Sequence, residues 1–329
     1  MKTFSFLSSV SPFKRTVALT TLAISTGAPA GFACSVCGCS LSSDWAAQGY
    51  VATPGLDGGI RFEYFEQSDL RHGTNSVDRS TLSFPNEDEV QQRTVNRNTW
   101  LDLNYVFDSS WAVSASIPEH DRFHTTIAAG DTGISTSRAS GLGDMRLLAR
   151  YQLSRDAGHR WSVQFGFKLP TGRFDQDFAE GPQAGQLLDR GLQLGTGTTD
   201  LLAGIAWFAR PAVSLGAFMQ ATLDQPLTAR AGFLPSTSLN FSGGIRWLNT
   251  SLFTPQLQLN VKSENREHGV EADTPNSGGM LVYLSPGVTT ELGQNSSSFV
   301  FVQLPVYQRV NGLQLEPRWL LSIGVRLKL

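Results

Sequence analysis

The residues best suited to chemistry are three cysteines within six positions of one another, Cys34, Cys37 and Cys39. Three thiolates this close are able to hold a soft ion such as Cu(I), or to contribute to a zinc site, for which the pattern names no fourth ligand. In an oxidising compartment the same residues would form one disulfide and leave one thiol. A c-type haem site is not indicated, because Gly38 stands where that motif has histidine.

The cysteines follow a segment with the pattern of a secretory signal peptide, residues 1–33. A basic start is followed by a short apolar core over 17–24 and by small residues, so cleavage is expected after Ala30 or Ala33. Cleavage before Cys34 also leaves lipidation of this residue open. The pattern predicts export into a Gram-negative envelope. It divides the chain into the signal peptide 1–33, a Cys-containing periplasmic or plug segment 34–56, and the remainder 57–329.

The overall composition excludes several classes of protein. The 329 residues include 26 Lys plus Arg and 28 Asp plus Glu, and this near-neutral balance gives no case for nucleic-acid binding. No apolar run approaches the roughly 20 residues of a membrane-spanning helix. Aromatic and β-branched residues recur throughout, which excludes a disordered chain.

From residue 57 onward, apolar and polar residues alternate in segments of about ten residues, which predicts strands. In one segment Trp161, Val163 and Phe165 alternate with Ser162 and Gln164. About twelve such segments follow one another. They lie near 57–67, 95–107, 111–118, 142–153, 160–170, 198–208, 212–223, 239–248, 252–262, 279–291, 298–309 and 316–329.

The connections between these segments are short and long in turn. A soluble sheet protein has no reason to place every long loop at one end, whereas an outer-membrane barrel combines tight periplasmic turns with long outer loops. Backbone polar groups in hydrocarbon need internal partners, so the sheet must close. The sequence therefore predicts an all-β fold, a transmembrane antiparallel up-and-down β-barrel of about twelve strands over 57–329, with both mature ends in the periplasm.

Charged residues on the inward phase of the strands are the candidates for lining a pore. Basic groups outnumber acidic ones among them, which favours anionic or polar solutes. The alternative is that these charges pair across strands and fill the barrel. The candidates are Arg61, Glu63, Asp102, Asp144, Arg146, Arg150, Lys168, Arg246, Lys262, Arg318, Arg326 and Lys328.

Four residues of the predicted long loop 119–141 combine metal-ligand types, namely Glu119, His120, Asp121 and His124. They could bind a divalent ion, or they could belong to a solvated outer loop. We favour the solvated loop.

The long loop 171–197 is rich in charge and glycine. It is expected either to fold into the barrel as a constriction or to remain exposed. Its charged residues are Arg173, Asp175, Asp177, Asp189 and Arg190.

An enzyme is not expected. No nucleophile elbow, zinc-protease helix or phosphate loop occurs in the sequence. The histidines fall in predicted loops or turns, and none belongs to a recognisable Ser/His motif; they are His72, His120, His124, His159 and His268.

Several short motifs resemble those of the outer-membrane transporters grouped under the name "MetA pathway of phenol degradation". These motifs are Gly141-Leu142-Gly143-Asp144, Lys168-Leu169-Pro170-Thr171-Gly172, Leu194 to Asp200, and Pro305 to Gln308 with Gly312 to Leu315. The resemblance covers roughly 140–329. It implies a barrel that transports small hydrophobic or aromatic compounds, and it supplies no set of substrate-binding residues. The cysteine-rich start is not part of the family pattern.

Taken together, the sequence predicts an outer-membrane channel or transporter for small solutes. Its expected partners are outer-membrane lipid, a small-molecule solute and the outer-membrane assembly machinery, and no nucleic acid. No cofactor is expected beyond a soft metal such as copper or zinc at the cysteines. The alternative is an envelope barrel without transport function, whose cysteines bind a metal or a periplasmic partner.

Overall fold

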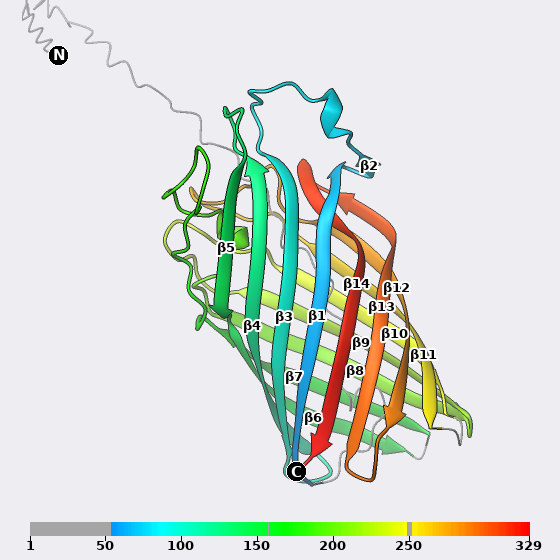
Figure 1. Cartoon of the computed structure of the whole chain (residues 1–329). Coiled ribbons are helices and arrows are strands. Elements are labelled where there is room, and N and C mark those ends of the chain that lie inside the picture. The colour runs from blue at the N-terminus through cyan, green and yellow to red at the C-terminus, as the bar shows by residue number, and fades with distance from the viewer. Residues whose placement is uncertain (1–53, 157, 249–251) are drawn as a thin grey trace, which may run out of the picture.

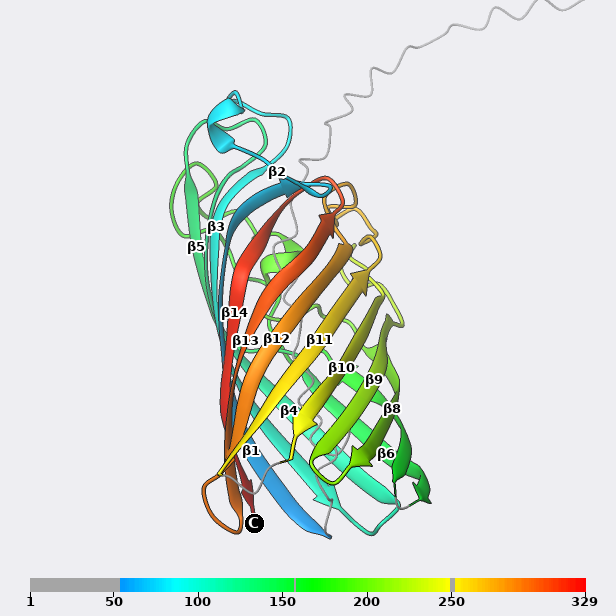
Figure 2. The ribbon, with the colours of Figure 1, turned by 90° about the vertical axis from the view of Figure 1, so that its right-hand side faces the viewer.

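The computed structural model describes residues 54–156, 158–248 and 252–329. These residues form one closed antiparallel barrel (Figures 1 and 2). The strands are β1 (Gly55–His72), β2 (Asn75–Ser76), β3 (Val90–Val106), β4 (Trp111–Ile127), β5 (Ser135–Leu142), β6 (Met145–Asp156), β7 (His159–Leu169), β8 (Asp200–Ala212), β9 (Leu215–Pro226), β10 (Ser238–Trp247), β11 (Phe253–Glu264), β12 (Gly279–Glu291), β13 (Ser296–Val310) and β14 (Leu313–Lys328). Two short 3₁₀ turns, η1 (Arg79–Thr81) and η2 (Arg190–Leu192), lie in long loops.

The barrel closes because β14 pairs with β1 from Asp57↔Lys328 to His72↔Leu313. Each wall strand is hydrogen-bonded to its sequence neighbour, except that β5 and β6 share one position in the wall. β4 pairs with β5 along 119–126 and with β6 along 111–116. With β2 only extending the tip of β1, the wall has twelve strand positions, as the sequence predicts.

The alternation of side chains explains which face of the sheet meets lipid. On β7 the outward Trp161 and Phe165 are 40% and 50% exposed, whereas the inward Ser162 and Lys168 are almost fully buried. Such exposure of large apolar side chains suits a hydrocarbon environment and not water.

Aromatic pairs occur toward both ends of the apolar outer face. At the short-turn end, the rings of Trp111 and Tyr151 are 4.8 Å apart, as are those of Tyr105 and Phe107. Toward the other end, Tyr64 lies 5.6 Å from Trp319. Aromatic rings of this kind are favoured at the two membrane interfaces.

One predicted loop is instead strand. β4 continues to Ile127 and pairs with β5, so most of 119–141, expected to be a loop, extends the wall at the end of the barrel opposite the C-terminus (Figure 1). Among the residues that the structure describes, no helix has the length and hydropathy needed to cross a membrane.

Candidate pore and constriction

The interior of the barrel encloses a cavity of about 490 Å³. Nine of the charged residues predicted to face inward line it: Arg61, Glu63, Asp102, Asp144, Arg146, Arg150, Lys168, Lys262 and Arg326. Arg246 is buried but not part of this lining. Arg318 and Lys328 are exposed and lie outside it. Arg318 lies within a register shift between β1 and β14, between Pro317 and Leu320, which changes the phase of the alternation there.

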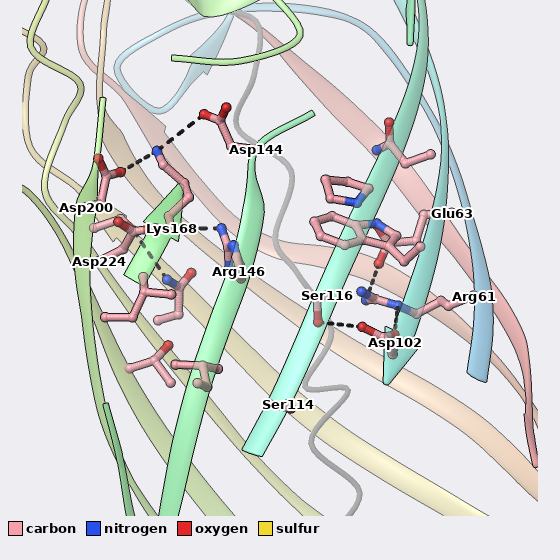
Figure 3. Close-up of a pocket in the computed structure, with 18 of the residues that line it drawn as sticks. Arg61, Glu63, Asp102, Ser114, Ser116, Asp144, Arg146, Lys168, Asp200 and Asp224 are labelled. Atoms are coloured by element: carbon pink, nitrogen blue, oxygen red, sulfur yellow. Dashed lines mark hydrogen bonds and ion pairs between the residues drawn. The ribbon is translucent and has the colours of Figure 1, made fainter. Parts of the chain in front are cut away.

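One charged cluster of the cavity lies on β1 and β3 (Figure 3). The Arg61 guanidinium is 2.7 Å from Glu63 and 3.8 Å from Asp102, and it stacks 4.9 Å from the ring centre of Trp100. The indole N–H of Trp100 donates to Glu63 at 3.1 Å, and the hydroxyl of Ser116 donates to Asp102 at 2.6 Å. Arg61 is therefore held on both sides by carboxylates.

A second charged cluster comes from β6 to β9 (Figure 3). The Lys168 ammonium forms an ion pair with Asp200 and lies 4.0 Å from Asp144. Arg146 lies 3.6 Å from Asp224. The first contact joins the neighbouring strands β7 and β8, and the second joins β6 to β9 across the inner face. Such pairing is what the sequence left as the alternative to free lumen charges.

The cavity lining of the described residues carries eight basic and eight acidic side chains, so neither sign is in excess. The sequence predicted a basic excess because it missed five acids of this lining, namely Asp57, Asp200, Asp224, Glu264 and Glu267. Several of them lie near strand ends: β9 runs to Pro226, whereas the alternation in the sequence fades at residue 223. Extending the strands to the ends of their partner strands would have identified Asp224 and Glu264. Asp57 and Asp200 already lie at the starts of predicted segments, and Glu267 lies in the loop after β11.

Asp144 joins three of the motifs that carry the family resemblance. Its carboxylate accepts hydrogen bonds from the backbone N–H of Gly172 at 3.0 Å and of Thr196 at 2.8 Å, and from the Thr196 hydroxyl at 2.8 Å. A methyl group on Gly195 would lie 2.5 Å from the Asp144 carboxylate and from the Gly172 carbonyl oxygen. The motif glycines therefore permit a close backbone crossing, and Asp144 clamps both ends of the loop between β7 and β8.

The loop clamped in this way folds into the barrel. Arg190 and Gly191 line the cavity. From the wall, the Arg122 guanidinium donates to the carbonyl oxygens of Gly191 and Gln193 at 3.3 and 3.2 Å. Figure 2 shows η2 inside the outline of the barrel. The structure divides the loop between the two arrangements left open by the sequence. Asp189 and Arg190 are buried on the inward part, whereas Arg173, Asp175 and Asp177 are exposed.

Two further contacts fix the shape of this loop. The guanidinium of Arg190 lies between Phe174 and Phe233, 4.5 and 4.8 Å from their ring centres. A buried apolar cluster packs the loop against β5 and comprises Ala139, Phe178, Leu188, Leu192 and Leu194. We call residues 174–194 the constriction loop.

Acidic groups are buried where the long loops meet. Burial, reinforced by the charges of Glu267, Glu89 and Asp273, holds the pKa of Asp189 well above its usual range. Burial also raises the pKa of Asp273 to about 7, against the hydrogen bonds that it accepts from Asn276. Burial therefore favours the neutral form of both carboxyls, and for Asp273 this form predominates below about pH 7.

The loop 265–278 is expected to loosen as the pH rises. A carboxyl with a raised folded pKa stabilises the fold below its unfolded pKa of about 3.9 and loses this contribution as the pH passes its folded value. Amide exchange in this loop should accelerate between about pH 4 and about pH 7, beyond its intrinsic pH dependence. In Asp273→Asn this additional acceleration should be weaker, and equal acceleration in both proteins would contradict the assignment.

The structure supports neither the divalent site nor the solvated loop that the sequence favoured for this segment. Glu119, His120, Asp121 and His124 lie on β4, not in a loop, so alternate residues face opposite sides of the wall. The Nδ1 atoms of His120 and His124 are hydrogen-bonded to Asn98 and Thr94, each at 2.8 Å. Among the described residues, no group of three or more His, Cys, Asp or Glu side chains is placed to hold a metal ion. Cys34, Cys37, Cys39 and the predicted signal peptide lie outside the described residues.

Comparison with known proteins identifies the architecture. An outer membrane channel from Pseudomonas putida F1 superposes with a TM-score of 0.63 over 85% of this chain and 97% of its own, at 10% sequence identity. The barrel has the fold of an outer-membrane channel. Weaker matches include the NanC porin, with a TM-score of 0.46 and 12% identity over 84% of this chain and 100% of the porin. The translocator domain of the autotransporter NalP from Neisseria meningitidis matches with a TM-score of 0.47 and 9% identity over 87% of this chain and 92% of its own. No protein-family profile and no curated protein sequence matches the chain.

Proposed function

We propose that the protein is an outer-membrane channel through which small polar solutes diffuse, and that it has no catalytic role. The observation that carries this proposal is a closed barrel with an apolar outer face and a cavity lined by paired charges. The apolar face suits a bilayer, and the closed wall satisfies the backbone within it. Export by the predicted signal peptide and long loops at one end support an outer-membrane location.

The charged lining favours polar cargo. A purely hydrophobic solute could not replace the hydrogen bonds that the lining side chains make with water, so its passage would cost free energy. The charged side chains concerned include Arg61, Asp102, Lys168 and Asp224. A polar solute can exchange hydrogen bonds with these groups during passage. The resemblance to the phenol-degradation transporters would favour aromatic cargo instead, so the two solute classes need separate tests.

The proposal is tested with refolded mature protein in planar lipid bilayers and in liposomes. We expect discrete conductance steps, and faster liposome swelling with small sugars or amino acids than with empty liposomes. Folding is checked beforehand by circular dichroism and by heat-modifiable migration in gels. Folded protein without conductance would overturn the channel proposal. Uptake of a small aromatic compound without uptake of polar solutes would overturn the proposed substrate class.

Neutralising three cations of the lining should make the channel cation-selective. Arg146, Arg150 and Arg326 line the cavity, where opposite charges are balanced. In a potassium chloride gradient the native channel should reverse near zero potential. The reversal potential of the triple glutamine variant should move toward the equilibrium potential of potassium. We expect the ratio of potassium to chloride permeability to rise several-fold.

The matched control neutralises three lining acids, Asp57, Asp102 and Asp224, as asparagine. This variant should shift selectivity toward chloride. Unchanged reversal potentials in both conducting variants would show that these side chains do not line the path of the ions.

A further inference from the structure

A row of arginines lies on the outer face of the barrel, at the end where the long loops are. The row consists of Arg93 and Arg97 on β3 and Arg138 on β5, with Asp121 on β4 between them and Glu66 on β1, on the other side of β3. The side chains of the three arginines are 50%, 46% and 67% exposed. We call these five residues the arginine row.

The strand alternation places the arginine row outside the barrel. On β3 the neighbours Asn96 and Asn98 are buried on the inner side. On β4 the residue after Asp121, Arg122, bonds to the constriction loop inside the barrel. On β5 the residue after Arg138, Ala139, packs in the cluster beneath that loop.

The carboxylates of the row hold the guanidinium groups in place without matching their number. Arg93 makes a two-bond pair with Glu66 at 2.8 and 3.0 Å. Asp121 accepts two bonds from Arg138 at 2.9 and 3.1 Å, and one from Arg97 at 3.3 Å. Three cations thus share two anions. Each guanidinium has five N–H donors, so donors remain for another ligand.

Further exposed charges border the row. Arg318 acts electrostatically on Glu66. The exposed Glu119 lies two residues before Asp121 on the same face of β4. Glu180, paired with Thr136 two residues before Arg138, is also exposed. The positive excess therefore belongs to the row itself, with three guanidinium groups against two carboxylates, and the bordering charges do not add to it.

The height of the row corresponds to the outer boundary of the membrane. Glu66 follows the aromatic pair Tyr64 and Trp319 directly, and the Tyr64 hydroxyl lies 3.4 Å from its carboxylate. From Leu56, near the short-turn end, to Glu66 the strand rises by roughly 33 Å. With the usual strand tilt this corresponds to about 25 Å along the membrane normal, the height of an apolar band. The row thus begins where lipid headgroups are expected.

We propose that the arginine row binds the phosphate groups of a phosphorylated glycolipid of the outer leaflet, whose acyl chains lie along the apolar wall below. This inference rests on the proposed outer-membrane location. Arginine binds phosphate through two parallel N–H···O bonds, and its planar fork is pre-oriented here by the carboxylates. Because β4 lies between Arg93 and Arg97 on β3 and Arg138 on β5, the row can contact a ligand with more than one phosphate.

The test uses the full mature protein in detergent micelles, native mass spectrometry and three lipids: bis-phosphorylated lipid A, the same lipid A with both phosphates removed, and phosphatidylglycerol. We expect the bis-phosphorylated lipid to bind roughly tenfold more tightly than the dephosphorylated one. Replacing Arg93, Arg97 and Arg138 by glutamine should remove this preference. Exposed ion pairs contribute little to stability, so the variant should fold.

The matched control replaces three arginines outside the row, Arg173, Arg210 and Arg230, all exposed. It removes the same charge and should keep the lipid preference. The proposal fails if both lipid A forms bind equally, if the row variant binds like the native protein, or if the control loses the preference equally. Equal binding of phosphatidylglycerol would reduce the site to a general anionic patch and overturn the glycolipid assignment.

Conductance of the same preparations separates this inference from the channel proposal. A native protein that conducts and shows no lipid preference overturns only the arginine-row site. A native protein that binds the phosphorylated lipid but never conducts overturns the channel and leaves the site.

Discussion

Excising the constriction loop should raise single-channel conductance several-fold. The loop places Arg190 and Gly191 in the cavity and is held there by Arg122. Its two ends are already adjacent, since the N–H of Gly195 donates to the carbonyl of Arg173 at 2.9 Å. Residues 174–194 can therefore be replaced by a short Gly-Ser linker without stretching the wall. The Asp144 bonds to Gly172 and Thr196 remain in this variant.

A matched excision distinguishes a constriction from a general effect of shortening loops. Residues 77–87 form another long loop, and none of them lines the cavity. Shortening this loop with the same linker should leave conductance unchanged. A folded protein lacking 174–194 whose conductance equals that of the native protein would show that the narrowest part of the path lies elsewhere.

A milder variant tests the cause of the closure. In Arg190→Met the loop keeps its length but loses the guanidinium between Phe174 and Phe233. It also loses the bond at 2.7 Å to the carbonyl of Thr196. We expect more frequent fluctuations between conductance levels, with a smaller mean increase than after excision.

The sequence predicts the barrel well where lipid touches one face and the lumen the other. There, each strand alternates strictly, as in Trp161 to Phe167. Above the lipid boundary the outer face is polar as well, and the alternation of hydropathy disappears. Glu119 and Asp121 face outward from β4, while His120 and His124 face inward. Both faces of this stretch are therefore polar, and its sequence resembles that of a loop.

The candidate pore was predictable only in part, for two physical reasons. The inward position of charges in the middle of strands, such as Arg61 and Lys168, can be predicted from the alternation of side chains alone. The position of Arg318 cannot, because a register shift changes the phase of the alternation there; its mark in the sequence of β14 is Pro317, a residue type found at bulges. The inward position of the constriction loop depends on packing between distant segments, Ala139 of β5 with Phe178 and Leu192 of the loop. No local pattern encodes such contacts.

The largest loss of stability is expected from removing Lys168. Its ammonium lies between Asp200 and Asp144, and all three side chains are almost completely buried. In Lys168→Met, Asp200 keeps only the hydrogen bond from Thr198 at 2.7 Å, among the contacts resolved here. Breaking one side of a buried ion pair costs about 3 kcal/mol. The free energy of unfolding, measured by tryptophan fluorescence in denaturant, should fall by about that amount.

The double variant Lys168→Met with Asp200→Asn determines whether the loss comes from an uncompensated charge. Removing both charges also removes the cost of burying one of them alone, so most of the stability should return. Asp144 retains its bonds to Gly172 and Thr196 in both variants and keeps the loop clamp. The single variant should also favour potassium over chloride, because the remaining carboxylates line the cavity. If the double variant were as unstable as the single one, Lys168 would act through the packing of its alkyl chain, and the ion pair would have no net stabilising effect.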